Sequence, residues 1–112
     1  MWSNKYYYIN MYRDKDLSEI LPTDAMKSIF SSLEELESNG DFGFKNREGF
    51  PFIRINLLYV KSINSWSSNN ADEERTNFIV IECTKEDKEL KYYRKLFKPI
   101  TDVLDWEFVE ED

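Results

Sequence analysis

The sequence predicts an α+β fold with a mainly antiparallel sheet of four to five strands and two helices on one face of the sheet. Segments rich in aromatic and β-branched residues, which are typical of strands, alternate with two segments whose apolar residues recur at helical spacing. The predicted order is strand, helix, two or three strands, helix, strand, and packing both helices on one sheet satisfies it. The 112 residues show no internal repeat and no linker, so we expect a single domain over residues 1–112.

The chain begins with a predicted strand over residues 5–13, KYYYINMYR. Alternate residues of a strand point to opposite faces, and both sets are bulky here: Tyr6, Tyr8 and Tyr12 on one face, and Tyr7, Ile9 and Met11 on the other. Bulk on both faces indicates either a central strand or a strand whose second face is covered by a partner.

A predicted helix follows within residues 21–40. Its inward stripe consists of apolar residues at helical spacing: Met26, Ile29, Phe30, Leu33 and Leu36. Thr23 or Asp24 can cap its first turn, and Gly40 can end it in a left-handed conformation. Three acids would then lie in its last turn, where the helix dipole disfavours them: Glu34, Glu35 and Glu37. We interpret these acids as serving a purpose other than helix stability.

The middle of the chain is predicted to form strands separated by polar turns. Phe42 and Phe44 indicate a short strand, and residues 46–49 indicate a turn. A longer strand spans residues 52–63, with four alternating apolar residues on its inner face: Ile53, Ile55, Leu57 and Tyr59. Residues 64–75 are rich in Ser, Asn and acids, so they are predicted to form a loop.

The last third of the chain follows a predicted buried strand over residues 77–83, NFIVIEC, and is helical in its spacing. Thr84 can cap this helix, and three acids follow at the end that the dipole favours: Glu86, Asp87 and Glu89. Pro99 lacks a backbone donor and clashes with the preceding turn. We therefore expect a kink or a break near Lys98, with Pro99 opening a short second segment.

The chain closes with a predicted strand, DWEFVEE, over residues 105–111. Trp106 and Phe108 share one face of it, and two large aromatic side chains left in water would form an apolar patch. We therefore expect both to pack on the domain. With this strand in place, the order of elements is that of a ferredoxin-like sandwich.

The composition favours a cytoplasmic protein without direct contacts to nucleic acid. No apolar run is long enough to span a membrane, and the N-terminal residues lack the apolar segment of a signal peptide. The single cysteine, Cys83, cannot form an internal disulfide. The 22 acids and 15 bases give a net charge of −7, which disfavours binding to phosphates. The bases and aromatic residues of residues 91–98 could hold RNA, but a helix with a solvated basic face is the favoured interpretation.

Residue types suited to catalysis are scarce. The chain has no histidine, and Cys83 follows an apolar run with no base to activate it, so we expect a buried, inert thiol. One thiolate without an imidazole does not make an ordinary zinc site. Residues 69–74, NNADEE, supply carboxylates but lack the spaced acids and the glycine of a calcium loop. The sequence therefore predicts a protein that is not an enzyme and that holds no metal or cofactor.

The residue types that remain suit the recognition of a basic protein. Acids steer the encounter with such a partner, and a few aromatic side chains usually carry most of the affinity. The candidate partner-binding residues are one tryptophan and two groups of acids: Trp66, Asp72, Glu73, Glu74, Glu107, Glu110 and Glu111. We expect the two groups of acids to lie close together. In the alternative interpretation, the acids only keep the protein soluble, and Trp66 is partly buried together with Trp106.

In size, acidity and order of strands and helices, the whole chain resembles the small immunity proteins of bacterial contact-dependent inhibition and related polymorphic toxin systems. The resemblance is one of profile, and no residue motif carries it. It implies a protein that binds a cognate basic toxin domain, often a nuclease, inside the producing cell and blocks it. We expect no contact with membrane or nucleic acid, and a monomer before the complex forms.

Two other functions are compatible with the same fold. One is a small enzyme or ligand-binding domain that works through carboxylates and tyrosines, in which case a small molecule or divalent ion would raise the melting temperature. The other is a self-associating regulatory domain, which would use the first strand because that strand is bulky on both faces.

Overall fold

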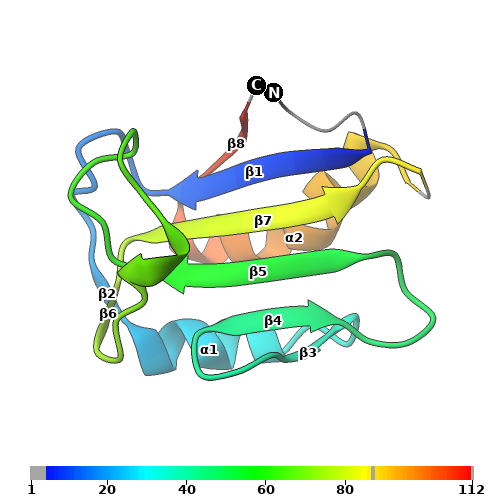
Figure 1. The fold of residues 1–112 in the computed structure, drawn as a ribbon, viewed down its shortest axis with the longest axis horizontal. Coiled ribbons are helices and arrows are strands. Elements are labelled where there is room, and N and C mark those ends of the chain that lie inside the picture. The colour runs from blue at the N-terminus through cyan, green and yellow to red at the C-terminus, as the bar shows by residue number, and fades with distance from the viewer. Residues whose placement is uncertain (1–4, 87, 112) are drawn as a thin grey trace.

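A computed structural model describes residues 5–86 and 88–111, and in these residues a six-stranded sheet carries two helices on one face (Figure 1). The strands of this sheet are β1 (Tyr6–Tyr12), β3 (Leu36–Ser38), β4 (Gly43–Asn46), β5 (Ile53–Leu58), β7 (Phe78–Thr84) and β8 (Glu107–Glu111). The remaining elements are α1 (Thr23–Ser31), α2 (Leu90–Leu104), the 3-10 turn η1 (Ser68–Asn70), and the paired short strands β2 (Leu21–Pro22) and β6 (Arg75–Thr76). The predicted α+β class is confirmed, but the sheet has six strands rather than four to five.

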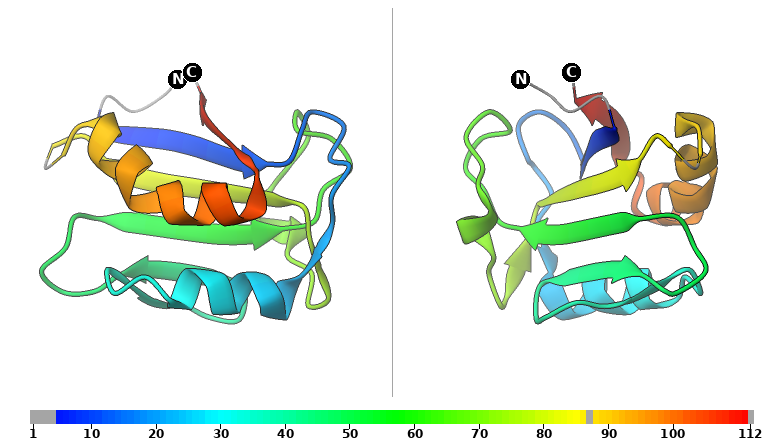
Figure 2. Two further views of the ribbon diagram at one scale, coloured as in Figure 1. Left: turned by 180° about the vertical axis from the view of Figure 1, so that it is seen from behind. Right: turned by 45° about the vertical axis from the view of Figure 1, so that its right-hand side comes forward.

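The strand order of the main sheet is β3-β4-β5-β7-β1-β8, and all neighbouring strands are antiparallel. β1 therefore lies inside the sheet, between β7 and β8, and β8 forms one edge. Both helices lie on the same side of the sheet, which Figure 2 shows from behind. An antiparallel sheet with one strongly apolar face is covered in this way.

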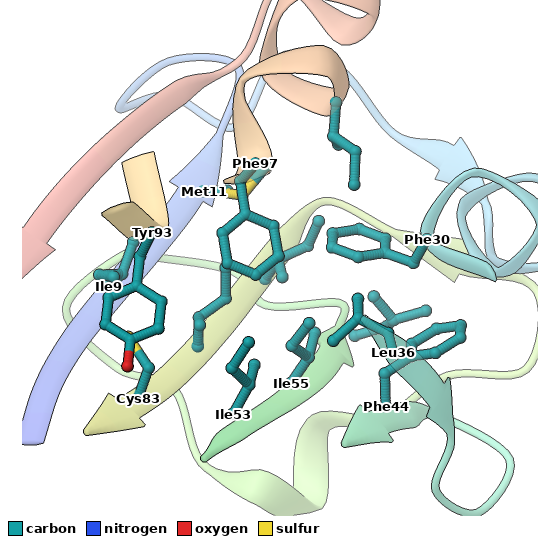
Figure 3. Close-up of a cluster of buried hydrophobic side chains, with 14 of the residues drawn as sticks. Ile9, Met11, Phe30, Leu36, Phe44, Ile53, Ile55, Cys83, Tyr93 and Phe97 are labelled. Atoms are coloured by element: carbon teal, nitrogen blue, oxygen red, sulfur yellow. The ribbon is translucent and has the colours of Figure 1, made fainter. Parts of the chain in front are cut away.

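The main core lies between the sheet and the two helices (Figure 3). Aliphatic side chains such as Ile9 and Ile55 point from the strands toward aromatic side chains of the helices. The ring of Phe30 lies 6.3 Å from that of Phe97, so the two helices meet through these residues. The hydroxyl of Tyr93 donates a hydrogen bond to the carbonyl oxygen of Thr84 at 2.7 Å, which satisfies a polar atom inside the core.

A second, smaller core covers part of the opposite face of the sheet. There residues 59–71, called the covering segment below, fold over the ends of β1, β5 and β7 (Figure 1). The buried apolar residues of this core are Tyr12, Leu17, Leu58, Val60, Phe78 and Val80. The rings of Tyr12 and Phe78 stack with their centroids 5.7 Å apart. The second face of β1 is therefore covered in part by the chain itself.

The helix predicted within residues 21–40 is shorter than expected and ends at Ser31. The hydroxyl of Ser31 donates to a carbonyl oxygen in the preceding turn, and the hydroxyl of Ser32 donates to that of Ile29 at 2.6 Å, so the last turn is closed by side chains. Leu36 keeps the apolar pattern because it also points into the core, but it does so from β3 and is 1% exposed.

The predicted ends of this helix are wrong as well. Thr23 does not cap the first turn, because its hydroxyl donates to the carbonyl oxygen of Asp72, and the residue at the cap position, Pro22, has no side-chain donor or acceptor. Gly40 is left-handed with φ of 78°, but it lies in the turn between β3 and β4. Three acids therefore lie beyond the last helical turn, and the dipole argument does not apply to them: Glu34, Glu35 and Glu37.

Helix α2 begins at Leu90 rather than directly after Thr84. The hydroxyl of Thr84, in β7, accepts a hydrogen bond from the backbone N–H of Glu86 and makes a turn before the helix. The N–H of Leu90 donates to the hydroxyl oxygen of Tyr7 at 3.0 Å, so a side chain of β1 satisfies the helix start. Glu86 and Glu89 therefore precede the helix, and Asp87 lies outside the described residues.

The predicted break near Lys98, with Pro99 opening a second segment, is also wrong, because α2 runs without interruption through Pro99. Pro99 is exposed, whereas Phe97 and Ile100 on either side of it are buried in the main core. Packing of these two side chains holds the helix on the sheet and outweighs the loss of one backbone hydrogen bond.

The strand predicted over residues 52–63 ends at Leu58, because the chain then turns away from the sheet. The N–H of Tyr59 donates to the carbonyl oxygen of Asn70, and that of Val60 donates to Oδ1 of Asn77, both at 2.9 Å. The strands predicted at both ends of the chain and in residues 77–83 are confirmed. No helix among the described residues has the length and apolar character that crossing a membrane requires.

Candidate protein-binding surfaces

Strand β8 forms one edge of the main sheet and carries three acids. It pairs with β1 on one side, with Glu111 opposite Tyr8 and Glu107 opposite Tyr12. None of the described strands pairs with its other side. Glu107 and Glu110 are exposed, and Glu111 is partly exposed. Three of the predicted partner-binding acids therefore lie on one accessible strand.

The aromatic residues of the C-terminal segment pack on the domain, as predicted. Trp106 is 4% exposed, and Phe108 packs against the main core with its ring 6.4 Å from that of Phe97. These contacts fix β8 in place. The acids of the strand are therefore presented on a rigid element.

A cleft beside β8 adds further carboxylates to this edge. It is lined by Arg13, Asp14, Asp105, Trp106 and Glu107. The guanidinium of Arg13 forms an ion pair with Asp105, and the hydroxyl and N–H of Ser18 donate to Asp14, which lowers the pKa of that carboxyl. Together with Glu19, whose Oε1 accepts from Trp106 Nε1, we call these carboxylates the acidic edge: Asp14, Glu19, Asp105, Glu107, Glu110 and Glu111.

The predicted loop acids have different roles. Oδ1 of Asp72 accepts hydrogen bonds from the backbone N–H of Glu74 at 2.9 Å and of Arg75 at 3.0 Å. These bonds, the one from Glu74 first, lower the pKa of the Asp72 carboxyl. Asp72 therefore shapes the loop, whereas Glu73 and Glu74 are exposed.

The structure does not bring the loop acids and the C-terminal acids together. The N–H of Thr23, at the start of α1, donates to the carbonyl oxygen of Glu74 at 3.2 Å, which holds the loop beside α1. β8 lies beyond β1, at the other edge of the main sheet (Figure 1). The expectation of proximity is therefore wrong, because the pairing of β2 with β6 fixes the loop on the α1 side.

Trp66 lies in the covering segment and is partly buried. Its ring is 6.2 Å from that of Phe78, so it helps to hold the segment on the sheet. Contact of Trp66 with a partner stays a prediction.

The part of this sheet face that the covering segment leaves uncovered is called the open face. The pairing register places six side chains in one row across the sheet: Glu37, Lys45, Arg54, Glu82, Tyr8 and Glu111. Next to this row, the ring of Tyr6 lies 5.5 Å from that of Phe52, and the guanidinium of Arg54 lies 5.1 Å from the Phe52 centroid. Burial, followed by the charge and hydrogen bond of Glu82, raises the pKa of Tyr8.

The exposed side of α2 is basic. Tyr93, Phe97 and Ile100 face the core, whereas five bases on or just before the helix are exposed: Lys88, Lys91, Arg94, Lys95 and Lys98. This agrees with the predicted solvated basic face. The acidic edge and the basic helix therefore give the molecule a strongly uneven charge distribution.

The Cys83 thiol has the character of a core residue. It is fully buried, and burial raises its pKa from 9.0 to about 12, so it is not a thiolate at neutral pH. Within residues 5–86 and 88–111, no three His, Cys, Asp or Glu side chains are grouped so that they could hold a metal ion. No protein-family model, no curated protein and no solved structure matches this chain.

Proposed function

We propose that the protein is an immunity-type inhibitor that binds a cognate basic toxin domain in the cytoplasm and blocks its active site. The class of toxin that we propose is a nuclease. The observation that carries this proposal is the acidic edge, whose six carboxylates lie on β8 and beside it. Two bases adjoin them: Arg13, which pairs with Asp105, and Arg94, whose guanidinium lies 4.8 Å from the centroid of the Phe108 ring of β8. Burial of Trp106 and Phe108 holds β8 rigidly, so the acids do not depend on a disordered tail. A rigid acidic surface suits a partner with a basic active-site cleft.

The charge distribution supports attraction of a basic partner over a distance. The chain carries a net charge of −7, and residues 88–98 contain five bases and one acid, so the remaining residues carry −11. A field of this kind acts over about 8 Å at physiological ionic strength and raises association rates with an oppositely charged partner. The high pKa of the buried Cys83 thiol fits binding better than thiol chemistry.

We also propose a ferredoxin-like sandwich for the centre of the fold, with the β3–β4 hairpin added at one edge. The spatial order β5-β7-β1-β8 supports this, as does the chain order β1, α1, β5, β7, α2, β8. In such an arrangement the last strand lies at the sheet edge next to the first. That position is what exposes the acids of β8.

The test begins with capture of the partner from cells that naturally make the protein, followed by its identification by mass. The partner is then purified, and its catalytic activity and association rate with this protein are measured at several salt concentrations. We expect a basic domain whose activity is lost at a one-to-one ratio. A captured partner that is acidic, or that stays fully active in the complex, would overturn the proposal.

Charge-neutral variants test the role of the acidic edge. Glu107→Gln, Glu110→Gln and Glu111→Gln together should slow association and flatten its salt dependence, with the melting temperature nearly unchanged. The matched control neutralises three exposed acids elsewhere: Glu34, Glu48 and Glu86, each to Gln. Equal effects of the two triple variants would show that net charge, and not the acidic edge, attracts the partner.

A further inference from the structure

We infer that the open face anchors the basic partner, and that the acidic edge mainly steers the partner toward it. This inference rests on the proposed function, because it assigns the contact surface of the same complex. It concerns residues on β1 and β7 and residues on and just before β5, and β8 pairs with β1 at the side of this group. The open face is on the side of the sheet away from both helices (Figure 2).

The open face carries the side chains that usually dominate protein interfaces. Tyr6, Tyr8 and Phe52 are each partly exposed and lie in one group, with ring centroids 6.5 Å apart for Tyr6 and Tyr8. Arg54 lies over the Phe52 ring. Tyrosine and arginine are enriched among the residues whose truncation costs most binding energy. Because these side chains stand on paired strands and contact each other, little conformational freedom is left to lose on binding.

The charges of the open face indicate which groups a partner surface must present in order to fit it. Glu111 is opposite Tyr8, and Glu82 is opposite both Tyr8 and Arg54, so the acidic edge continues directly into the open face. Arg54 and Lys45 follow along the row, and Glu37 at its far end forms an ion pair with Lys45. The partner surface that fits therefore has a basic group opposite Glu82, an apolar patch opposite Tyr6 and Phe52, and an acceptor opposite Arg54.

The covering segment borders the open face at one end. It stands out from the sheet at one end of the open face (Figure 2) and is fixed there by Asn77, whose Oδ1 and Nδ2 bond to the N–H and carbonyl oxygen of Val60, each at 2.9 Å.

The experiment separates anchoring from steering because anchoring residues affect the dissociation rate, whereas steering residues affect the association rate. With the captured basic partner, Tyr6→Ala and Arg54→Ala should raise the dissociation rate about tenfold or more and leave the association rate nearly unchanged. Neutralising Glu107, Glu110 and Glu111 should lower the association rate and leave the dissociation rate nearly unchanged. Tyr92→Ala is the matched control, because Tyr92 is a partly buried tyrosine on α2, on the other side of the sheet.

A photo-reactive phenylalanine analogue at position 6, with position 92 as control, maps the contact without any loss of a side-chain contact deeper in the fold. Adducts with the basic partner from position 6 alone support the inference. Adducts from position 92 alone, or dissociation unaltered in both open-face variants, would overturn it while leaving the proposed function intact. An adduct between two copies of the chain would also overturn it. Failure to capture any basic partner would instead remove the proposed function.

Discussion

The indole Nε1 of Trp106 donates a hydrogen bond to Oε1 of Glu19 at 2.6 Å, which ties the residue before β8 to the segment between β1 and β2. Trp106 is 4% exposed, so this bond satisfies the polar atom of an otherwise buried ring. One carboxylate of the acidic edge therefore holds the edge strand in place, in addition to contributing charge.

Removal of this carboxylate should destabilise the fold. We expect Glu19→Ala to lower the free energy of unfolding by about 1.5–3 kcal/mol, because a hydrogen bond to a charged group is lost and a buried donor is left unpaired. Glu19→Gln should keep most of the stability, since the amide oxygen can still accept. Urea unfolding checks both, with Glu48→Ala as an exposed control. If Glu19→Ala and Glu48→Ala unfold alike, the bond does not stabilise the domain.

Periodicity predicted the elements of this fold better than it predicted their ends. The strands of residues 77–83 and 107–111 were predictable because their composition and alternation are local properties. The ends of α1 and α2 depend on contacts between distant residues. The N–H of Leu90 donates to the hydroxyl of Tyr7, which is 83 positions away in the chain. Leu36 fits the helical spacing of apolar residues but lies in strand β3. A single sequence carries no local trace of such contacts.

The acids of β8 were predictable as candidates because they lie within five residues of one another, whereas the open face was not predictable. Tyr8, Arg54 and Glu82 come from three strands, and only the pairing register places them in one row. The bulk on both faces of β1 was the one available indication of this surface. The prediction that the loop acids and the β8 acids lie close together was wrong for the same reason. The position of the loop depends on the pairing of β2 with β6, and strands of two residues leave no recognisable pattern in the sequence.

Pro99 offers a direct route to a more stable protein. It lies on the exposed side of an unbroken helix, where proline removes one backbone hydrogen bond. Pro99→Ala restores the donor and should raise the free energy of unfolding by about 1–3 kcal/mol. The control is Val103→Ala, at a position of α2 that is 75% exposed, which should change stability by only tenths of a kcal/mol. No greater gain for Pro99→Ala than for the control in thermal unfolding would show that the helix accommodates proline without cost.

Gly43 allows a close approach between β4 and its neighbours. A Cβ atom at this position would lie 2.6 Å from the carbonyl oxygen of Ile55 and 3.2 Å from that of Asn39, and neither backbone atom can move without disturbing the sheet. We expect Gly43→Ala to lower the free energy of unfolding by about 1–3 kcal/mol. Ser65→Ala, in the exposed part of the covering segment, is the control. A urea midpoint equal to that of the control would show that β4 shifts freely.

The buried thiol of Cys83 makes stability depend on pH above neutrality. Its pKa is about 12 in the folded protein because of burial, against an ordinary 9.0. Well below pH 9.0 both states hold the proton, and no dependence arises from this group. Above it the unfolded chain loses the proton while the folded chain keeps it, so the free energy of unfolding should fall by about 1.4 kcal/mol per pH unit from this thiol alone.

Cys83→Ala tests this dependence without relying on absolute stability, because the constant cost of the smaller side chain does not change the slope against pH. The comparison is made between pH 9 and about 10, where the unfolded chain loses the thiol proton. Burial also raises the pKa values of Tyr8, Tyr12 and Tyr92, which adds a slope of the same sign, but this contribution is common to both proteins and cancels in the comparison. Unfolding in urea at each pH should give a steeper decline for the natural chain than for the variant. Parallel declines would mean that the Cys83 thiol ionises as easily in the folded protein as in the unfolded chain.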